Sequence, residues 1–396
     1  MPSIGHWARI RDIQQQAGNR RRAGAQRCYP WSGRSTLRQT TNREGAMSEN
    51  NGIKALSLAT LGVCLAFPLT SLAMTITIAH EEPANAQTSA AHLSAMVFKD
   101  VIETQSNGEM SVDIQAASSM GNQRDRMELT QAGIIDVNVA SIGGLSQFYP
   151  NMNAIDLPFA FPDTVIAERV FDGDFGERLS QQLHEATGLH LLAVTAGDFY
   201  VFTNSKQPVR SPDDMEGLRV RTMSVPSHIT MMNALGAAAT PVPWDELYGA
   251  METGVVDAQH NPIPIMAIGN LQEVQDYATL TNHLYGADWW VASDDFLSGL
   301  SDDQRRIFHT AVETAKVAGR GAKLGLRATQ FGTEYLQDAG LEVYSPSPEE
   351  LARFRELAVP AVMSSLEEEF GQQAAELAQA MLEAVEEVEA ALYGGR

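Results

Sequence analysis

The sequence predicts an α/β protein made of two lobes, each built around its own sheet. Segments with strand-type and helix-type apolar patterns follow one another in a β-α-β-α-β order between residues 75 and 140. This order is typical of a parallel sheet. A second rhythm of the same kind begins at residue 189. The chain has 396 residues, of which 44% are apolar, so it is long enough to form two cores.

The first rhythm is expected to occupy residues 75–187. We predict strands at 75–79, 110–116 and 134–140, where apolar residues alternate with polar ones or form short runs. Helices are predicted between these strands, at 89–105 and from Gly121-Asn122 to about residue 131. An irregular apolar stretch follows at 151–162, and further helices then extend to about Thr187.

The second rhythm is expected to continue to the end of the chain. The predicted strands are 189–194, 199–203, 218–222, 255–258, an extended region at 278–292, and 341–344. The predicted helices include a short one that starts at Ser211-Pro212, then 226–235 and 243–253. A capping box at Ser301 and Gln304 opens a long helix to about residue 338, with Gly319 and Gly321 as weak points. Ser347 starts another helix, and an amphipathic helix from Phe370 to Leu392 ends the chain.

The first 73 residues differ in composition from the rest. Residues 1–46 hold nine arginines, and Met47 then precedes an apolar run at 55–69 that ends in Ser71-Leu72-Ala73. This pattern is that of a secretory signal peptide with cleavage near Ala73. We therefore expect 1–46 to be untranslated upstream sequence, 47–73 to be the signal peptide, and the protein to be periplasmic. A genuine arginine-rich extension is the alternative for residues 1–46.

The exported part is strongly acidic and has no cysteine. Residues 74–396 hold 18 basic and 46 acidic residues, a net charge of about −28, which disfavours nucleic acid and anionic membranes as partners. Both cysteines precede residue 74, so a thiol nucleophile is excluded. No metalloprotease, Walker, dinucleotide-binding or nucleophile-elbow motif is present. The histidines lack metal-ligand spacing, and His184 and His190 are expected on different elements, so neither a metal nor a cofactor is predicted.

One predicted strand carries two arginines. Alternation places Leu218, Val220 and Thr222 on one face of the strand and Arg219 and Arg221 on the other. A guanidinium group can form two parallel hydrogen bonds with a carboxylate, so an arginine here is a candidate ligand for an organic acid. Two solvated arginines are the alternative.

Two further segments carry side chains suited to a ligand. Trp244 stands at a helix start within Pro241–Tyr248, where its ring could cover a ligand or pack in a core. Asn261 ends a predicted strand directly before Pro262, where its amide could meet a ligand or form a turn. Each alternative remains open on composition alone.

An ordered set of segments resembles the solute-binding proteins of TRAP transporters, the DctP family. The matching segments are Asp214–Arg221, Ala234–Ala237, Pro241–Tyr248 and Met251–Pro262, together with Leu129–Gly133, Ile155–Phe159 and Phe202–Lys206 upstream. Each segment alone is a weak signal, but their order over residues 74–345 is specific. The resemblance implies a periplasmic binding protein fold, in which two α/β lobes joined by hinge strands and a long lobe-spanning helix close on a ligand. We expect residues 74–198 and 287–326 to form one lobe and residues 199–286 and 327–396 the other.

The resemblance also implies a function. Family members are not enzymes; they deliver a solute, usually an organic acid, to the membrane subunits of a TRAP permease. Arg221 falls on the family's carboxylate-binding arginine, Asn261 on a binding asparagine, and Trp244 where an aromatic residue lines the cleft. The chain departs from the family at His260, which replaces a usual glutamate. It also lacks a second arginine before Phe202, which disfavours a dicarboxylate or a sugar acid that needs two cations.

The start of the chain adds an acidic group to the expected site. The segment Ala79-His80-Glu81-Glu82 is similar to the start of ectoine-binding members, where an acid meets a cationic group of the ligand. We expect Glu82 and Ser141 to face Arg221 across the cleft, with Tyr200 as a further lining residue. The predicted ligand is a small molecule with a carboxylate group, and zwitterions belong to this class. The protein is expected to be a monomer. The alternatives are a ligand-sensing partner of a receptor and an α/β enzyme that uses Asp198 with Glu82.

Overall fold

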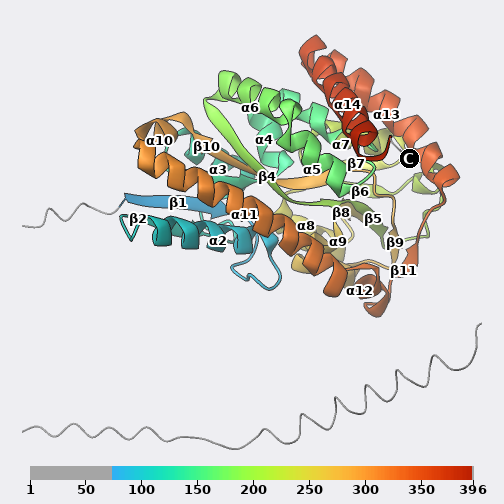
Figure 1. The fold of residues 1–396 in the computed structure, drawn as a ribbon. Coiled ribbons are helices and arrows are strands. Elements are labelled where there is room, and N and C mark those ends of the chain that lie inside the picture. The colour runs from blue at the N-terminus through green and yellow to red at the C-terminus, as the bar shows by residue number, and fades with distance from the viewer. Residues whose placement is uncertain (1–73, 395–396) are drawn as a thin grey trace, which may run out of the picture. The chain divides into compact units, whose positions relative to one another are not determined.

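The computed structural model describes residues 74–394, which form two mixed sheets covered by helices (Figure 1). The predicted signal peptide and the segment before it lie outside the described residues. The first sheet has the strand order β2-β1-β3-β10-β4, and the second has the order β11-β9-β5-β8-β6-β7. The two-lobed α/β architecture expected from the sequence is confirmed. No helix among residues 74–394 has the length and apolar character needed to span a bilayer.

The first sheet combines parallel strands from the start of the chain with an antiparallel pair. Its strands are β1 (Met74–His80), β2 (Met110–Gln115), β3 (Val137–Ala140), β4 (Leu189–Phe199) and β10 (Tyr285–Ser293). Apolar residues of α2 (Ala90–Gln105) and α11 (Asp302–Thr329) form one core with this sheet. The helices α3 (Gln123–Gln131), α4 (Ile142–Phe148), α5 (Thr164–Asp172) and α6 (Asp174–Thr187) complete this part, with the 3₁₀ segment η1 (Pro150–Asp156).

The second sheet is assembled from short strands. They are β5 (Val201–Asn204), β6 (Arg219–Thr222), β7 (Ala238–Pro241), β8 (Ala258–Asn261), β9 (Tyr277–Thr279) and β11 (Glu342–Tyr344). The helical elements around them are η2 (Pro212–Met215), α7 (Pro226–Ala234), α8 (Trp244–Glu252), α9 (Ile263–Ile268), η3 (Leu271–Val274) and α12 (Thr333–Asp338). Residues of α8, α9, η3 and α12 share a core with this sheet.

Three chain segments connect the two sheets. Only Tyr200 separates β4 of the first sheet from β5 of the second, and the chain returns from β9 to β10 through residues 280–284. The helix α11 runs from α10 (Asp294–Gly299) beside the first sheet to α12 beside the second (Figure 1). The strands β4 and β10 pair antiparallel along most of their length. These are the hinge strands and the long helix that the resemblance implied.

Two C-terminal helices contact both groups of elements. The helix α13 (Pro348–Phe370) packs on α7, and α14 (Gln372–Tyr393) packs on η1 and α5. Their buried residues belong to the same core as the aromatic side chains Phe161, Phe171 and Trp289. Residues after 327, which the sequence prediction assigned to one lobe, therefore also contact elements assigned to the other.

Several predicted boundaries differ from the observed ones. The strand expected at 189–194 continues to Phe199, and the strand expected at 255–258 begins only at Ala258, because residues 253–257 form the turn after α8. Gly319 and Gly321 lie inside α11 without breaking it; the break falls at residues 330–332. The last predicted helix, Phe370–Leu392, corresponds to α14, and only Phe370 belongs to α13, because Gly371, with φ +82°, separates the two helices. The strand β7 was not predicted.

Candidate functional site

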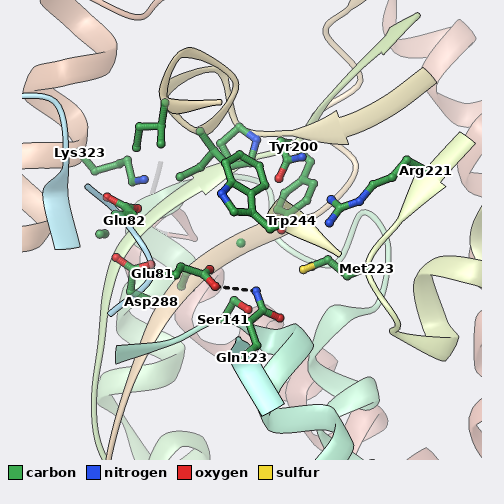
Figure 2. Close-up of a pocket in the computed structure, with 17 residues that line it drawn as sticks. Glu81, Glu82, Gln123, Ser141, Tyr200, Arg221, Met223, Trp244, Asp288 and Lys323 are labelled. Atoms are coloured by element: carbon green, nitrogen blue, oxygen red, sulfur yellow. Dashed lines mark hydrogen bonds between the residues drawn. The ribbon is translucent and has the colours of Figure 1, made fainter. Parts of the chain in front are cut away.

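A pocket lies where the two sheets are joined, and elements of both line it (Figure 2). The wall from the first group comes from the residues just after β1, the start of α3 and α4, the first residues of β10 and the C-terminal part of α11. The wall from the second comes from β6, the start of α8, the end of β8 and α9. The charged and polar lining residues are Glu81, Glu82, Gln123, Ser141, Tyr200, Arg221, Trp244, Asn261, Asp288 and Lys323.

Arg221 is the cation on the side of the second sheet. Its side chain is 3% exposed, and its Nε donates to the carbonyl oxygen of Val242 at 2.9 Å. Among residues 74–394, no carboxylate forms an ion pair with this guanidinium group. Burial, only partly offset by Tyr200 and Glu81, lowers the pKa of Arg221 to about 10. A buried cation without a protein anion is a binding site for an anion from outside.

The neighbouring Arg219 has a different environment. Its side chain is 46% exposed, and it forms a bidentate pair with Asp257 at 2.7 and 2.8 Å. The predicted alternation of the strand is correct for both arginines, but only Arg221 lines the pocket. The strand therefore offers one free guanidinium group and one that is already paired.

Carboxylates lie on the other side of the pocket. Glu81 accepts hydrogen bonds from Gln123 Nε2 at 2.8 Å and from the buried Arg126 Nη2 at 3.2 Å. Glu82, which is 7% exposed, accepts a 2.6 Å hydrogen bond from Ser89 Oγ at the start of α2. These partners hold both carboxylates in place, because each side chain has a fixed donor.

Asp288 and Lys323 complete this side, and Figure 2 shows both near Glu82 and away from Arg221. A register shift between Gly286 and Asp288 interrupts the pairing of β10 with β4, and such bulges re-aim side chains. The Asp288 side chain keeps some exposed surface, but its Oδ2 is buried and has no hydrogen-bond partner. Burial and the charges of Glu82 and Glu81 raise the pKa of Asp288 well above its usual value, although Lys323 opposes this shift.

Aromatic and amide groups lie between the two charged sides. The Trp244 ring and Tyr200 stand between Arg221 and the acidic groups in Figure 2. Asn261 ends β8, lines the pocket and donates from Nδ2 to Gln259 Oε1 at 2.6 Å. Ser141 caps α4 by position, but its buried Oγ makes no hydrogen bond. The pocket therefore offers one flat aromatic surface and unused polar groups.

Behind Tyr200 lies a cluster of buried histidines. His260 Nδ1 and His283 Nε2 are 3.1 Å apart, and His283 Nδ1 lies 2.6 Å from Thr281 Oγ1. The rings of His260 and His228 are 5.0 Å apart. Burial, and secondarily the charge of His228, lowers the pKa of His283 to about 3, and burial also lowers the pKa of His260 well below its usual value. The folded protein thus keeps both imidazoles neutral at pH values where the unfolded chain would protonate them.

This cluster predicts loss of stability in mild acid. Between pH 6.5 and about 3 the unfolded chain binds a proton at His283 that the folded protein does not, so stability falls as pH falls. From pH 7 to pH 5 His283 alone should cost about 2 kcal/mol of unfolding free energy. Urea unfolding at both pH values should show a smaller decrease for His283→Gln than for the wild type. An equal decrease in both proteins would contradict this assignment.

The structure brings all six predicted site residues to this one pocket: Arg221, Asn261, Trp244, Glu82, Ser141 and Tyr200. It does not bring Asp198 there, because that carboxylate is 2.6 Å from Arg327 Nη1 and lies outside the lining. The acid pair of the enzyme alternative is therefore not assembled. The prediction that a second cation is lacking was incomplete, since Lys323 lines the pocket and Arg126 lies behind Glu81.

The sequence held signals for the residues that were missed. Lys323 continues the buried face of α11, four residues after Gly319 and eight after Ala315. A lysine on an otherwise apolar helix face is unusual in a core and indicates a functional position. Asp288 is the only charged residue in the extended region 278–292. Gln123 and Met223 carried no comparable signal.

Comparison with known proteins decides the family. The family model for DctP, described as bacterial extracellular solute-binding protein, family 7, matches residues 79–369, and these residues contain the whole pocket and every strand of both sheets except the first five residues of β1. The chain belongs to the DctP family. It is thus a solute-binding protein of the TRAP transporter type, and the resemblance inferred from the ordered motifs is confirmed.

Individual relatives of this DctP-family chain are similar over most of its length. The 2,3-diketo-L-gulonate-binding periplasmic protein YiaO of Escherichia coli is 32% identical over 65% of this chain and 77% of that protein. The ectoine-binding periplasmic protein TeaA of Halomonas elongata is 32% identical over 56% of this chain and 64% of that protein. The sugar acid binding protein DctPAm of Advenella mimigardefordensis, solved with galactonate, has a TM-score of 0.73 and 27% identity, covering 79% and 98% of the two chains.

Proposed function

We propose that this protein is the periplasmic solute-binding component of a TRAP transporter and captures a small carboxylate-bearing solute for delivery to the membrane permease. The observation that carries the proposal is Arg221, a buried guanidinium group that lines the pocket and has no carboxylate partner among residues 74–394. A ligand carboxylate would supply that partner in bidentate geometry. The names of the relatives, which include binders of sugar acids and of ectoine, support this class of ligand.

Capture is proposed to proceed by closure of two lobes. One lobe would comprise residues 74–198 and 287–326, and the other residues 199–286 and 327–396. The ligand would bridge Arg221 on the second lobe to Glu82 and Ser141 on the first, so that the closed state gains contacts that the open state cannot make. Tyr200, Trp244 and Asn261 would enclose the middle of the ligand.

The protonation of Asp288 is proposed to select the far end of the ligand. The pocket and its support hold three acids and three cations, namely Glu81, Glu82, Asp288, Arg126, Arg221 and Lys323. With Asp288 protonated, as the raised pKa favours, the site has one excess positive charge and suits a monoanion. The far end of that ligand would then carry hydroxyl groups that pair with Glu82, Asp288 and Lys323. A hydroxylated monocarboxylate is therefore the ligand we favour, and the presence of Lys323 removes the reason to disfavour a sugar acid.

A zwitterion is the second candidate. If a ligand ammonium group approached Glu82 and Asp288, it would favour the ionised form of Asp288, and the site would then balance a molecule with no net charge. The three carboxylates on one side of the pocket are the observation in its favour.

The proposal is tested by a ligand screen on the purified protein. A thermal-shift panel would contain aldonates, uronates, simple monocarboxylates, amino acids and ectoine, with neutral sugars as the control. A ligand that binds only the folded state raises Tm, and isothermal titration then gives its affinity and stoichiometry. We expect one class of carboxylate to give a saturating shift at one ligand per chain. A shift with neutral sugars only, or catalytic consumption of the ligand, would contradict the proposal.

Asp288→Asn separates the two ligand classes. For a hydroxylated monocarboxylate we expect the affinity to change less than about threefold, because asparagine still donates and accepts hydrogen bonds as a protonated carboxyl group does. Wild type and Asp288→Asn should also show the same dependence of affinity on pH. A loss of tenfold or more, with wild-type affinity that rises with pH, would instead identify a zwitterion whose binding displaces the Asp288 proton.

In the alternative of a ligand-sensing protein, the pocket is the same, but the solute-bound form contacts a receptor and not the permease. A sensing protein would bind the same solute but would not support uptake. Reconstitution with the permease subunits, followed by uptake of the labelled ligand, distinguishes the two. Uptake that needs both this protein and the permease is the expected result.

A further inference from the structure

A second cluster of chemically active side chains lies away from the pocket, at the far end of the first sheet. His184 is in the last turn of α6, His190 is the second residue of β4, and Asp294 is the first residue of α10. Their ligand atoms all lie within 4.8 Å of one another. Sequence spacing does not predict this cluster, because the two histidines lack metal-ligand spacing and Asp294 is more than 100 residues further along the chain.

The three groups converge on one point. His184 Nε2 lies 3.3 Å and His190 Nε2 lies 2.9 Å from the same oxygen, Asp294 Oδ1. The two imidazole rings have centroids 3.9 Å apart, at an interplanar angle of 44°. Both histidines thus direct Nε2 toward the carboxylate. When Nε2 binds a metal ion, Nδ1 carries the proton of each neutral ring.

The backbone fixes the positions of these groups. Gly188 ends α6 with φ +71°, so the chain turns directly from His184 into β4. The Asp294 amide donates to the Gly188 carbonyl oxygen at 3.0 Å, and the pairing of β4 with β10 sets Ala292 opposite His190. The site is therefore built on a helix end and a strand pair, not on a loose surface.

The spacing suits a small transition-metal ion. In a tetrahedral site with ligand bonds of about 2.0–2.1 Å, neighbouring ligand atoms are about 3.3 Å apart. The two measured separations between ligand atoms, 2.9 and 3.3 Å, need only a few tenths of an ångström of adjustment. Two imidazoles and one carboxylate are a ligand set that Zn²⁺, Ni²⁺ and Cu²⁺ accept, whereas Mg²⁺ and Ca²⁺ prefer oxygen.

The surroundings leave room for a fourth ligand. The side chains of His184, His190 and Asp294 are 36%, 32% and 57% exposed, so water can reach the point where they converge. His184 and His190 also line a hollow on this face together with Glu177, Glu313 and the exposed His309. The acidic character of residues 74–396 would attract a cation to this surface.

We propose that His184, His190 and Asp294 form a binding site for one divalent transition-metal ion of the Zn²⁺ class, with water as the fourth ligand. The bound ion fastens the end of α6 and the start of β4 to the start of α10. Its role is structural, because it fixes the outer end of the β4–β10 pair whose other end lies beside the pocket. The site is independent of Arg221 and of the solute.

The test is a metal titration of protein that carries no polyhistidine tag and has been dialysed against EDTA. Isothermal titration with ZnCl₂ should give one ion per chain, and saturating Zn²⁺ should raise Tm by a few degrees, reversibly with EDTA. Binding should weaken below pH 6, because protons compete for the imidazole nitrogens. Substitution with Co²⁺ should give visible absorption bands of a four-coordinate site with nitrogen and oxygen ligands.

Matched variants separate this site from adventitious binding. The double variant His184→Gln/His190→Gln should bind Zn²⁺ at least 30-fold more weakly, and Asp294→Asn about tenfold more weakly. His309→Gln, an exposed histidine of the same hollow outside the triad, should bind as the wild type does. Tm values measured without metal establish that each variant folds. If the double variant does not fold, the Zn²⁺ affinity and the Co²⁺ spectrum of Asp294→Asn test the site instead. Wild-type affinity in the triad variants, or an equal loss in His309→Gln, would overturn the proposal.

Discussion

Replacing Arg221 by alanine is expected to weaken solute binding by roughly 30-fold or more, because the ligand carboxylate would then be buried without its charge-assisted partner. Loss of such a pair costs about 2–5 kcal/mol, and each 1.4 kcal/mol is tenfold in affinity. The measurement is isothermal titration with the acid that gives the largest thermal shift in the panel.

The same strand supplies the matched control. Arg219 lies two residues away and is paired with Asp257 outside the pocket, so Arg219→Ala should bind the solute as the wild type does. The two variants remove the same charge from the same strand and differ in what the side chain contacts, because Arg221 lines the pocket whereas Arg219 is paired with Asp257. Equal affinity for the solute in the wild type and Arg221→Ala would show that Arg221 is not the carboxylate ligand.

Arg221→Ala should also leave the ligand-free protein at least as stable as the wild type. The guanidinium group is buried and lacks an ion-pair partner among the described residues, so the free protein carries the desolvation cost of this charge. Thermal unfolding without ligand measures the difference. A fall in both affinity and ligand-free Tm would indicate that Arg221 supports the fold instead.

The second large effect is expected at the buried pair of His228 and Asp156. His228 Nε2 lies 2.6 Å from Asp156 Oδ2, and the side chains are 1% and 5% exposed. Substituting His228 by phenylalanine keeps a ring of similar size but leaves the carboxylate buried without its partner. Breaking a buried pair in this way costs about 3–5 kcal/mol. Urea unfolding at pH 7 should show this loss.

Asp156→Asn is the control for the pair. It keeps a hydrogen-bonding group beside His228 and leaves no buried carboxylate without a partner, so the loss should be about 1 kcal/mol. The double variant Asp156→Asn/His228→Phe should be less destabilised than the sum of the two single variants. Additive losses would show that the two side chains do not interact. The pair joins η1 to α7, the helix that follows β6 and Arg221, so a disturbed pair should also weaken solute binding.

The site shows how far sequence patterns extend. Strand alternation and the ends of elements made Arg221, Asn261 and Trp244 candidates, and the resemblance to the DctP family then selected them. Lys323 and Asp288 each broke a local pattern, a lysine on an apolar helix face and a lone charge in a buried strand, but neither pattern names a partner. Whether Asp288 and Lys323 line the pocket depends on a β-bulge and on the position of α11, and no local sequence pattern encodes either.

The sequence by itself determined the α/β class, most helices and strands, the ordered family motifs and the arginine that faces the pocket. The helices and strands follow from periodicity and capping, which act between residues a few positions apart, and the choice of Arg221 follows from the family resemblance. Only the tertiary structure decided which distant groups meet: Asp156 with His228, Glu82 with Asp288 and Lys323, and His184 and His190 with Asp294. These contacts depend on how the strands pair within each sheet and on how three connecting segments place the two sheets relative to each other. Burial then sets the charge of each group, as the raised pKa of Asp288 shows, because desolvation depends on the whole fold and not on neighbours in sequence.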